Sequence, residues 1–290
     1  MKTKLTIRML ALLTAILTIL CTVTACDEKD SEFQTEPVTQ LQTEPQTEPE
    51  TEPETEPEPE PLKLRIASYN IQHGASANLD MTKIAKTITD QSIDIVGLQE
   101  VDQGVNRSNK IDTMKLLSEA TGYQYYAFFK AINTDGGEYG VGVLSKYPIL
   151  STETVMLPSG SYEQRVLGRA EINVEGITVN FFVTHLSYET AALRKPQYQK
   201  INEEVSKYDN FVLTGDFNTD NFSEYSIIVN SGLVNNSKTN KVTFPGNNNS
   251  IDNIVYSSES WKFSNPYVIT QSYSDHYMLF SVGTYLKDRP

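Results

Sequence analysis

Cysteine is nearly absent from this chain of 290 residues, since only Cys21 and Cys26 occur. A fold held together by disulfide bonds is therefore excluded. Histidine is scarce as well, with three residues in the whole chain, so the cysteine and histidine ligands that zinc sites prefer are in short supply. The apolar run at residues 9–20 is short for a helix that crosses a membrane.

The first 26 residues have the features of an export signal. Basic residues at positions 2, 4 and 8 precede the apolar run, and small residues follow it, as in secretory signal peptides. The end of this segment, Val23-Thr24-Ala25-Cys26, resembles a bacterial lipobox, in which the cysteine becomes the lipidated first residue of the mature protein. We therefore predict a lipoprotein signal peptide at residues 1–25 and lipidation of Cys26. This predicts a protein of the bacterial cell envelope, held by a lipid anchor on the outer side of the cytoplasmic membrane. Cleavage near Ala25 with secretion is the alternative.

Residues 26–61 are predicted to form a disordered linker. The sequence Thr-Glu-Pro occurs there five times, starting at positions 35, 43, 47, 51 and 55. Proline blocks regular hydrogen bonding, like charges repel, and the segment has almost nothing apolar to bury. The folded part is then residues 62–290, which is long enough for one domain with a sizeable core.

Most of the net negative charge lies in that linker. The chain has a formal charge of −13, residues 27–61 carry −12, and residues 1–26 carry +3, which leaves −4 for residues 62–290. A mildly acidic domain does not favour binding to duplex nucleic acid, which depends on basic surfaces.

Hydrophobic patterns in residues 62–290 predict many strands and a few helices. The expected strands are 64–71, 94–99, 123–130, 139–144, 169–174, 177–185, 211–216, 250–256, 263–270 and 277–282. The expected helices are 80–89, 112–120, 191–208 with a kink or late start at Pro196, and 221–231, ended by Gly232. The aromatic stretch 125–129 is assigned to a core strand rather than to a membrane-docking loop. This content predicts an α/β (α+β) fold with two packed sheets and helices outside them.

Polar side chains recur where these strands begin or end. Asn70, Glu100 and His185 each follow an apolar run, and so do Asp216 and Asn218; Asp252 opens a strand, and Asp275 and His276 precede the last one. This ordered set resembles the endonuclease/exonuclease/phosphatase superfamily, also called deoxyribonuclease I-like. The resemblance covers essentially all of residues 62–290. It implies a four-layer α-β-β-α sandwich with two mainly antiparallel sheets.

Hydrolysis of a phosphoester needs compensation of the negative charge on the phosphate. A hard divalent cation held by oxygen ligands supplies it, so we expect Mg²⁺ or Mn²⁺ as the cofactor. Glu100 is the first choice of metal ligand, with Asn70 and Asp275 completing the shell, and the resemblance implies the same roles.

The attacking water needs a base. The resemblance implies that His276 is this base and that Asp252 orients its ring, an arrangement that fixes the tautomer. Asp216 and Asn218 are then expected to position the nucleophile or a phosphoryl oxygen. His185 is expected to donate a hydrogen bond to a phosphoryl oxygen or to protonate the leaving group.

Three further residues are candidates for binding the substrate phosphate. Arg165 matches a region where relatives place an anion-binding arginine, and Arg169 competes with it. His73 follows Asn70 by three residues and can reach the site, although a role in the loop alone is an equal alternative.

The sequence thus predicts a metal-dependent phosphoester hydrolase that acts as a monomer, most simply a phosphodiesterase with a nucleic acid, nucleotide or phospholipid as substrate. The alternatives are a phosphomonoesterase for inositol or sugar phosphates on the same fold, and a surface binding module without catalysis.

Overall fold

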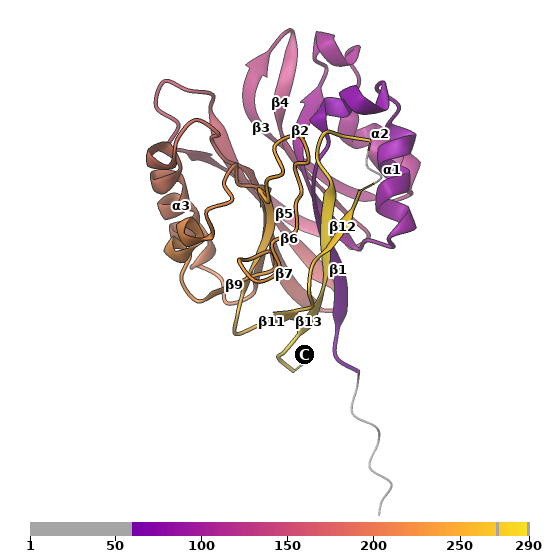
Figure 1. The fold of residues 1–290 in the computed structure, drawn as a ribbon. Helices are drawn as coiled ribbons and strands as arrows, with labels where there is room; N and C mark the ends of the chain where they lie inside the picture. The colour runs from indigo at the N-terminus through magenta and orange to yellow at the C-terminus, as the bar shows by residue number, and fades with distance from the viewer. Residues whose placement is uncertain (1–59, 271–272, 289–290) are drawn as a thin grey trace, which may run out of the picture. The chain divides into compact units, whose positions relative to one another are not determined.

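The computed structural model describes residues 60–270 and 273–288 (Figure 1). The predicted signal peptide, Cys26 and nearly all of the predicted linker lie outside these residues. Within the described ranges, no helix combines the length and the apolar character needed to cross a membrane.

Two sheets form the centre of the domain. One runs in the order β11 (Trp261–Phe263), β13 (Met278–Tyr285), β1 (Lys63–Asn70), β2 (Ile95–Gln103), β4 (Gly137–Ser145) and β3 (Tyr125–Thr134), and β12 (Tyr267–Ile269) also pairs with β13. The other runs β5 (Ile149–Leu157), β6 (Arg165–Val174), β7 (Ile177–His185), β8 (Phe211–Asp216), β10 (Asp252–Ser257) and β9 (Ser231–Leu233). Only β1–β2 and β7–β8 are parallel among these pairs, so both sheets are mainly antiparallel.

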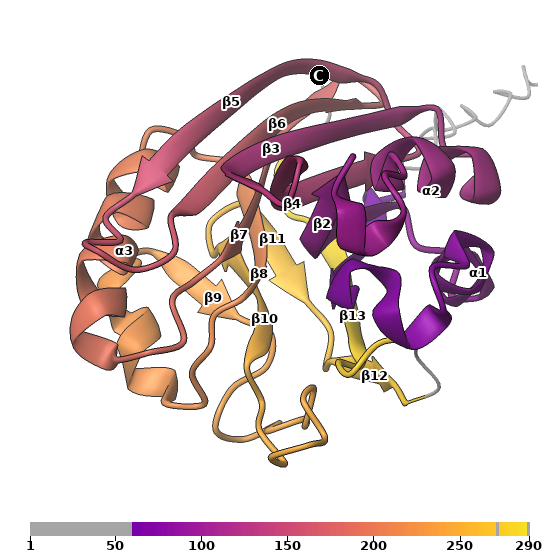
Figure 2. The same ribbon diagram turned by 90° about the horizontal axis from the view of Figure 1, so that it is seen from above.

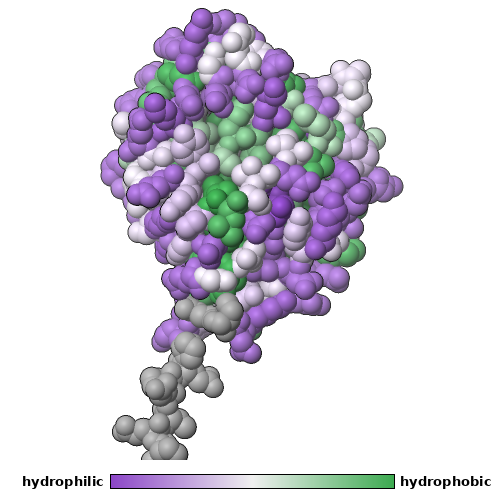
Figure 3. Space-filling model, turned by 180° about the vertical axis from the view of Figure 1, so that it is seen from behind, coloured by the Kyte–Doolittle hydropathy of each residue, from purple (hydrophilic) through white to green (hydrophobic). Residues whose placement is uncertain are grey.

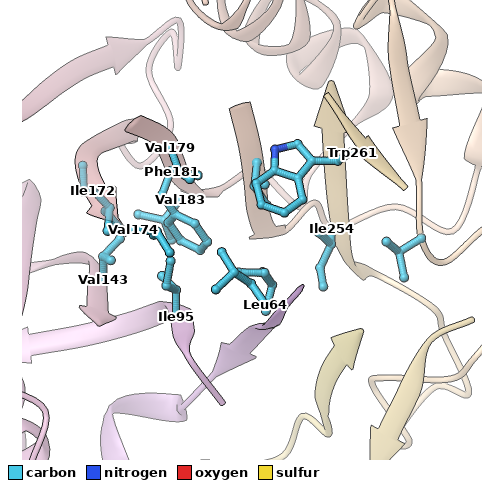
Figure 4. Packing of buried hydrophobic residues seen from close by; sticks show 14 of the residues in the cluster. Leu64, Ile95, Val143, Ile172, Val174, Val179, Phe181, Val183, Ile254 and Trp261 are labelled. Carbon is cyan, nitrogen blue, oxygen red and sulfur yellow. The ribbon is translucent and has the colours of Figure 1, made fainter. Parts of the chain in front are cut away.

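The main core fills the space between the two sheets. Strand residues alternate between the faces of a sheet, and on β1 the side chains of Leu64 and Ile66 point into this core. On the facing sheet, Phe181 and Val183 of β7 and Ile254 of β10 meet them (Figure 4). The same alternation continues to the strand ends, where polar residues take the inward-facing positions that apolar residues occupy earlier in each strand.

Helices cover the outer face of each sheet. α1 (Met81–Asp90) and α2 (Thr113–Thr121) bury apolar residues against the first sheet, where Ile84 and Ile88 join Tyr69 of β1. α3 (Ala191–Val205) covers the second sheet, where Tyr198 and Ile201 join Phe182 of β7. Figure 2 shows the helices on opposite sides of the two sheets. The predicted four-layer sandwich is confirmed.

Three predicted elements differ from the structure. Residues 221–231 form a short 3₁₀ helix, η3 (Phe222–Ile227), instead of an α-helix, and Gly232 lies within β9 rather than after a helix. A Cβ at Gly232 would meet the ring of Tyr256 on β10 at 2.1 Å, so pairing with β10 accounts for the glycine.

The predicted strand 263–270 is divided into β11 and β12, with Pro266 between them, because proline lacks the backbone N–H that a strand donates to its neighbour. The predicted helix 191–208 begins at Ala191, without a late start at Pro196, and ends at Val205.

Besides β9, strand β5 has no predicted strand as its counterpart. Most of its residues are exposed, so the apolar alternation that indicates a strand is missing. It lies at the edge of its sheet beside β3, the edge of the other sheet (Figure 2). The aromatic stretch 125–129 forms part of β3, as predicted, with Phe129 buried and Tyr126 41% exposed. From behind, the surface is largely hydrophilic with smaller hydrophobic areas (Figure 3).

Glycine permits close contact between the sheets at Gly97 of β2. A Cβ there would lie 1.9 Å from Oγ1 of Thr214 on β8 and 3.0 Å from Val183 on β7. The central strands of the two sheets therefore approach each other closely just before the ends that carry the polar residues.

Candidate active site

Most of the polar residues predicted from the sequence converge at one end of the sandwich, the upper end in Figure 1. Parallel strands end at the same edge of a sheet. Asn70 is accordingly the last residue of β1, His185 of β7 and Asp216 of β8. Antiparallel strands begin at that edge, and Asp252 is the first residue of β10, paired directly with Asp216. His276 lies two residues before the start of β13.

Strand alternation directs these side chains between the sheets. Asn70 has the same parity as Leu64 and Ile66 on β1, and Asp216 has the same parity as Val212 on β8. Nδ2 of Asn70 donates a hydrogen bond of 3.1 Å to Oδ2 of Asp216. This buried bond joins the two sheets within the site.

Glu100 reaches the site through an irregularity in β2. Val96 and Leu98 face the helices, and so does Val101, so one extra residue lies between Leu98 and Val101. Glu100 occupies this bulge with a φ of +57°, in the left-handed region that non-glycine residues seldom adopt. The bulge directs its carboxylate toward Asn70, whose Nδ2 donates to Oε1 at 3.1 Å.

Glu100 is held in its charged form. Burial alone would raise the pKa of its carboxyl, but the nearby imidazoles of His73 and His185 and the amide of Asn70 outweigh this effect. The pKa falls to about 2. Oε2 lies 3.6 Å from Nδ1 of His73, so the structure brings His73 to the candidate metal ligand.

Asp252 and His276 form a buried pair beside Asp216. Nδ1 of His276 lies 2.8 Å from Oδ2 of Asp252, and Nε2 lies 3.6 Å from Oδ2 of Asp216. Burial would lower the pKa of His276, but the two carboxylates raise it to about 10. The pKa of Asp216 is raised because it is buried and lies close to the charge of Asp252.

His185 lies on the other side of Asp216. Its Nε2 is 3.5 Å from Oδ2 of Asp216, and the side chain is buried. Burial and the positive charge of Arg165 lower its pKa well below the usual value, so the ring is neutral at pH 7. A neutral imidazole retains one N–H donor, which suits a hydrogen bond to a phosphoryl oxygen.

Arg165, the first residue of β6, is close enough to influence His185. Its side chain is 5% exposed, Nη1 forms a 3.0 Å ion pair with Glu163, and Nε has no hydrogen-bond partner among the described residues. A buried arginine with an unused donor fits an anion that arrives with the substrate.

Asn218 lies in the turn after β8. Its backbone N–H donates to Oδ1 of Asp216 at 3.0 Å, and its Nδ2 donates to the carbonyl of Leu186 at 2.9 Å. These bonds fix the side chain and leave its carbonyl oxygen available to a water or a phosphoryl group.

Two predicted residues are not placed among this group. Asp275 is exposed, and its carboxylate accepts from Nε2 of Gln72 at 3.0 Å. Its role as a metal ligand stays a prediction. Arg169 donates to Oδ1 of Asn180 at 2.8 Å and lies over the ring of Tyr208, away from the strand ends. The structure therefore favours Arg165 of the two arginines.

Two features of the site region had not been expected. The ring of Phe244 packs on His276 with centroids 4.8 Å apart. Thr243 and Phe244 lie in a long loop with no regular pattern, so their sequence gave no signal. The second feature is the ion pair of Asp102 and Arg107, just beyond Glu100. Asp102 follows Glu100 by two residues and is itself buried, but its pairing with Arg107 is visible only in the folded chain.

The donor atoms of the site suit a hard divalent cation. Oδ1 of Asp252 is buried without a hydrogen-bond partner within the described chain, and acidic oxygens outnumber nearby cations. Two sets of ligands are available: Glu100 with Asn70, and the cluster of Asp216, Asp252 and His276, whose ligand atoms lie within 4.8 Å of one another. In the second set, however, Asp252 already binds the imidazole of His276. We therefore favour Glu100 as the primary ligand, and its low pKa keeps it ionised for this purpose.

Known proteins resemble this chain in sequence and in fold. The sequence profile of the endonuclease/exonuclease/phosphatase family matches residues 67–276. A candidate neutral sphingomyelinase of Caenorhabditis elegans is 31% identical over 121 residues, which are 38% of this chain. The chain spans about a quarter of that relative, 26% of its length.

Solved structures share the fold at low sequence identity. An endonuclease/exonuclease/phosphatase of Beutenbergia cavernae has a TM-score of 0.67 and 22% identity, covering 77% of this chain and 72% of that one. The mannosyl-6-phosphatase Bt3783 of Bacteroides thetaiotaomicron has a TM-score of 0.58 and 19% identity, covering 77% of this chain and 100% of that one.

Proposed function

This chain belongs to the endonuclease/exonuclease/phosphatase family, whose members hydrolyse phosphoesters, and from that premise we propose that it is a Mg²⁺- or Mn²⁺-dependent phosphodiesterase. The observation that carries the proposal is the buried Asp252–His276 pair, which lies beside Asp216 and across the inter-sheet bond from Glu100.

The arrangement supplies a base with a fixed orientation. An ionised carboxylate can only accept a hydrogen bond, so Asp252 keeps the proton of His276 on Nδ1. In the deprotonated form of His276, which its raised pKa places at alkaline pH, Nε2 is then the atom that takes a proton from the attacking water. Asp252 stabilises the imidazolium that forms. Asp216 and Asn218 hold this water or a phosphoryl oxygen in line.

The remaining residues act on the phosphate and the leaving group. Arg165 binds a phosphoryl oxygen through its unused donor, and the neutral ring of His185 donates an N–H to a second oxygen or to the departing alkoxide. Glu100 and Asn70 hold the divalent cation, with Asp275 as a further ligand from the surface. The cation, when bound, compensates the negative charge of the ester and polarises the phosphorus.

The two similar proteins act, by their names, on different kinds of ester. The similar protein from C. elegans is named as a sphingomyelinase, whereas the Bacteroides protein is named as a phosphatase of a sugar phosphate. The sequence Thr184-His185-Leu186 resembles the phosphodiesterase-like branches of the family. A monoesterase is therefore the second candidate. A binding module without catalysis is a poor fit, because binding alone needs no Asp252 behind His276.

A substrate screen tests the proposal. The purified protein would be assayed with nucleic acids, nucleotides, phospholipids, inositol phosphates and sugar phosphates, each in Mg²⁺ or in EDTA. We expect chelator-sensitive cleavage of diesters, lost in His276→Ala and Glu100→Gln. Cleavage of monoesters alone would favour the second candidate, and full activity of both variants would disprove the site.

We further propose that the enzyme is a lipid-anchored monomer on the outer side of a bacterial cytoplasmic membrane. The support is the lipobox-like segment ending in Cys26 and the acidic linker after it. A Cys26→Ser variant should move from the membrane fraction to the soluble fraction. Retention of this variant in the membrane would contradict the anchor, and sedimentation measures the oligomeric state.

A further inference from the structure

Simple strand alternation along β2 does not direct Glu100 into the site. Its left-handed backbone and the bulge between Leu98 and Val101 are required to direct the carboxylate toward Asn70. Such conformations are unfavourable for residues other than glycine and persist only where surrounding contacts enforce them. The contacts that do so lie immediately after Glu100.

An ion pair between the buried carboxylate of Asp102 and the partly exposed guanidinium of Arg107 follows the bulge. Asp102 is fully buried, and its carboxylate accepts from Nε and Nη2 of Arg107 at 2.8 and 2.7 Å. It also accepts from Oγ of Ser108 at 2.9 Å. This two-point contact fixes both the position and the orientation of the Arg107 guanidinium relative to the Asp102 carboxylate. The guanidinium lies over the ring of Tyr139, 5.3 Å from its centroid, and Tyr139 is the residue of β4 that pairs with Asp102.

The segment that carries Arg107 is itself tied to the turn between β3 and β4. The backbone N–H of Arg107 donates to Oδ2 of Asp135 at 3.1 Å. Asn106 donates to the same residue through Nδ2 at 3.0 Å and through its backbone N–H at 3.0 Å. The chain from Glu100 to Arg107 is therefore held at both ends, on one side by β4 and on the other by this turn.

We propose that the Asp102–Arg107 pair is a positioning device for Glu100, which sets the affinity of the site for its divalent cation without touching the ion. The inference rests on the proposed role of Glu100 as a metal ligand. Supporting contacts behind a metal ligand typically change metal affinity by about 10- to 100-fold when they are removed. Arg107 acts here through the backbone of β2 rather than through a hydrogen bond to the ligand itself.

The test measures metal binding directly, by calorimetric titration of the full chain with Mn²⁺. Arg107→Gln removes the charge and the fork, and we expect it to weaken Mn²⁺ binding by about 10- to 100-fold. Arg107→Lys keeps the charge but not the two-point contact, and we expect an intermediate loss. The matched control is Arg169→Gln, which changes a partly buried arginine on β6 outside the site and should leave Mn²⁺ binding unchanged.

Two readouts separate positioning from other roles. At saturating Mn²⁺, Arg107→Gln should recover most of its kcat with little change in KM, because the substrate is not its contact. If Arg107→Gln unfolds, Asp135→Ala weakens the same segment from the exposed turn and should also lower Mn²⁺ affinity.

The outcomes distinguish this inference from the proposed function. Loss of binding in Glu100→Gln together with wild-type affinity in Arg107→Gln and Asp135→Ala would overturn the positioning role alone. Undiminished binding in Glu100→Gln would overturn both the metal site and the positioning role.

Discussion

Nδ1 of His276 lies 2.8 Å from Oδ2 of Asp252, although the two residues come from different sheets. Asp252 begins β10, and His276 precedes β13. The pair therefore exists only when the sheets are packed in register. Because Asp252 sets both the tautomer and the charge of the imidazole, it is the most direct point at which to test the mechanism.

Asp252→Asn should change the pH dependence of the reaction. The charge of Asp252 raises the pKa of His276, so its removal should lower this pKa. The limb of kcat/KM that rises with pH should move to lower pH, while the maximal rate should fall about 10²- to 10⁴-fold because the base loses its orientation. A pH–rate profile of both proteins measures the effect, and an unmoved limb would argue against His276 as the base.

The interaction between Asp252 and His276 should also make the stability of the protein depend on pH, in a direction that can be stated. A group whose pKa is raised on folding stabilises the protein below its unfolded pKa, near 6.5 for histidine, and this contribution is lost as pH rises toward about 10. The advantage in melting temperature of the wild type over Asp252→Asn should therefore be largest below pH 6 and shrink with rising pH. An advantage that grows with pH would contradict the assignment.

Metal binding should depend on Glu100. Mg²⁺ or Mn²⁺ should raise the melting temperature of the wild type, since a ligand that binds only the folded state stabilises it. Glu100→Gln should lose most of this increase, because an amide is a weaker ligand for a hard cation than a carboxylate. Differential scanning calorimetry with and without metal measures it. Equal increases in melting temperature in the two proteins would instead identify the cluster around Asp216 as the primary metal site.

Arg165 and Arg169 offer a matched pair on one strand. Arg165→Gln should lower kcat/KM by about 10- to 100-fold, the value of one charge-assisted hydrogen bond to the substrate. Arg169→Gln should stay within about twofold, because its guanidinium binds Asn180 and Tyr208 instead. Steady-state kinetics decide between them, and a larger loss in Arg169→Gln would reverse the assignment.

Gly97 should be intolerant of a single methyl group. Thr214 is buried, and its Oγ1 would lie 1.9 Å from the new Cβ, so Gly97→Ala should destabilise the fold by about 1–3 kcal/mol. Activity should fall as well, because Asn70 and Asp216 would be separated. Urea unfolding measures the stability. Combining the change with Thr214→Ala should cost less than the sum of the single changes, and strict additivity would argue against the contact.

Alternation explains why so much of the site could be predicted. Asn70, His185, Asp216 and Asp252 each continue the inward-facing positions of an apolar strand, and this pattern is visible in the sequence. Family motifs added the roles of these residues, and the four-layer fold followed from the same resemblance.

Other features depend on contacts that the local sequence does not encode. The bulge at Glu100 and the packing of Phe244 on His276 arise from distant segments. The exposed strand β5 lacks apolar alternation. The α-helix predicted at 221–231 does not form, and Gly232 pairs with β10 instead. In each case a tertiary partner decided the local structure.

The pairing of β1 with β13 determines how late in synthesis the site can form. β1 is the first strand of the domain and β13 the last, yet they pair over six residues from Lys63 and Thr284 to Ser68 and Leu279. Until synthesis has passed Tyr285, β1 has an open edge, and His276 has no strand to hold it beside Asp252. Such long-range pairing slows folding. The growing chain therefore cannot form the proposed Asp252–His276 pair until nearly all of the domain has been synthesised.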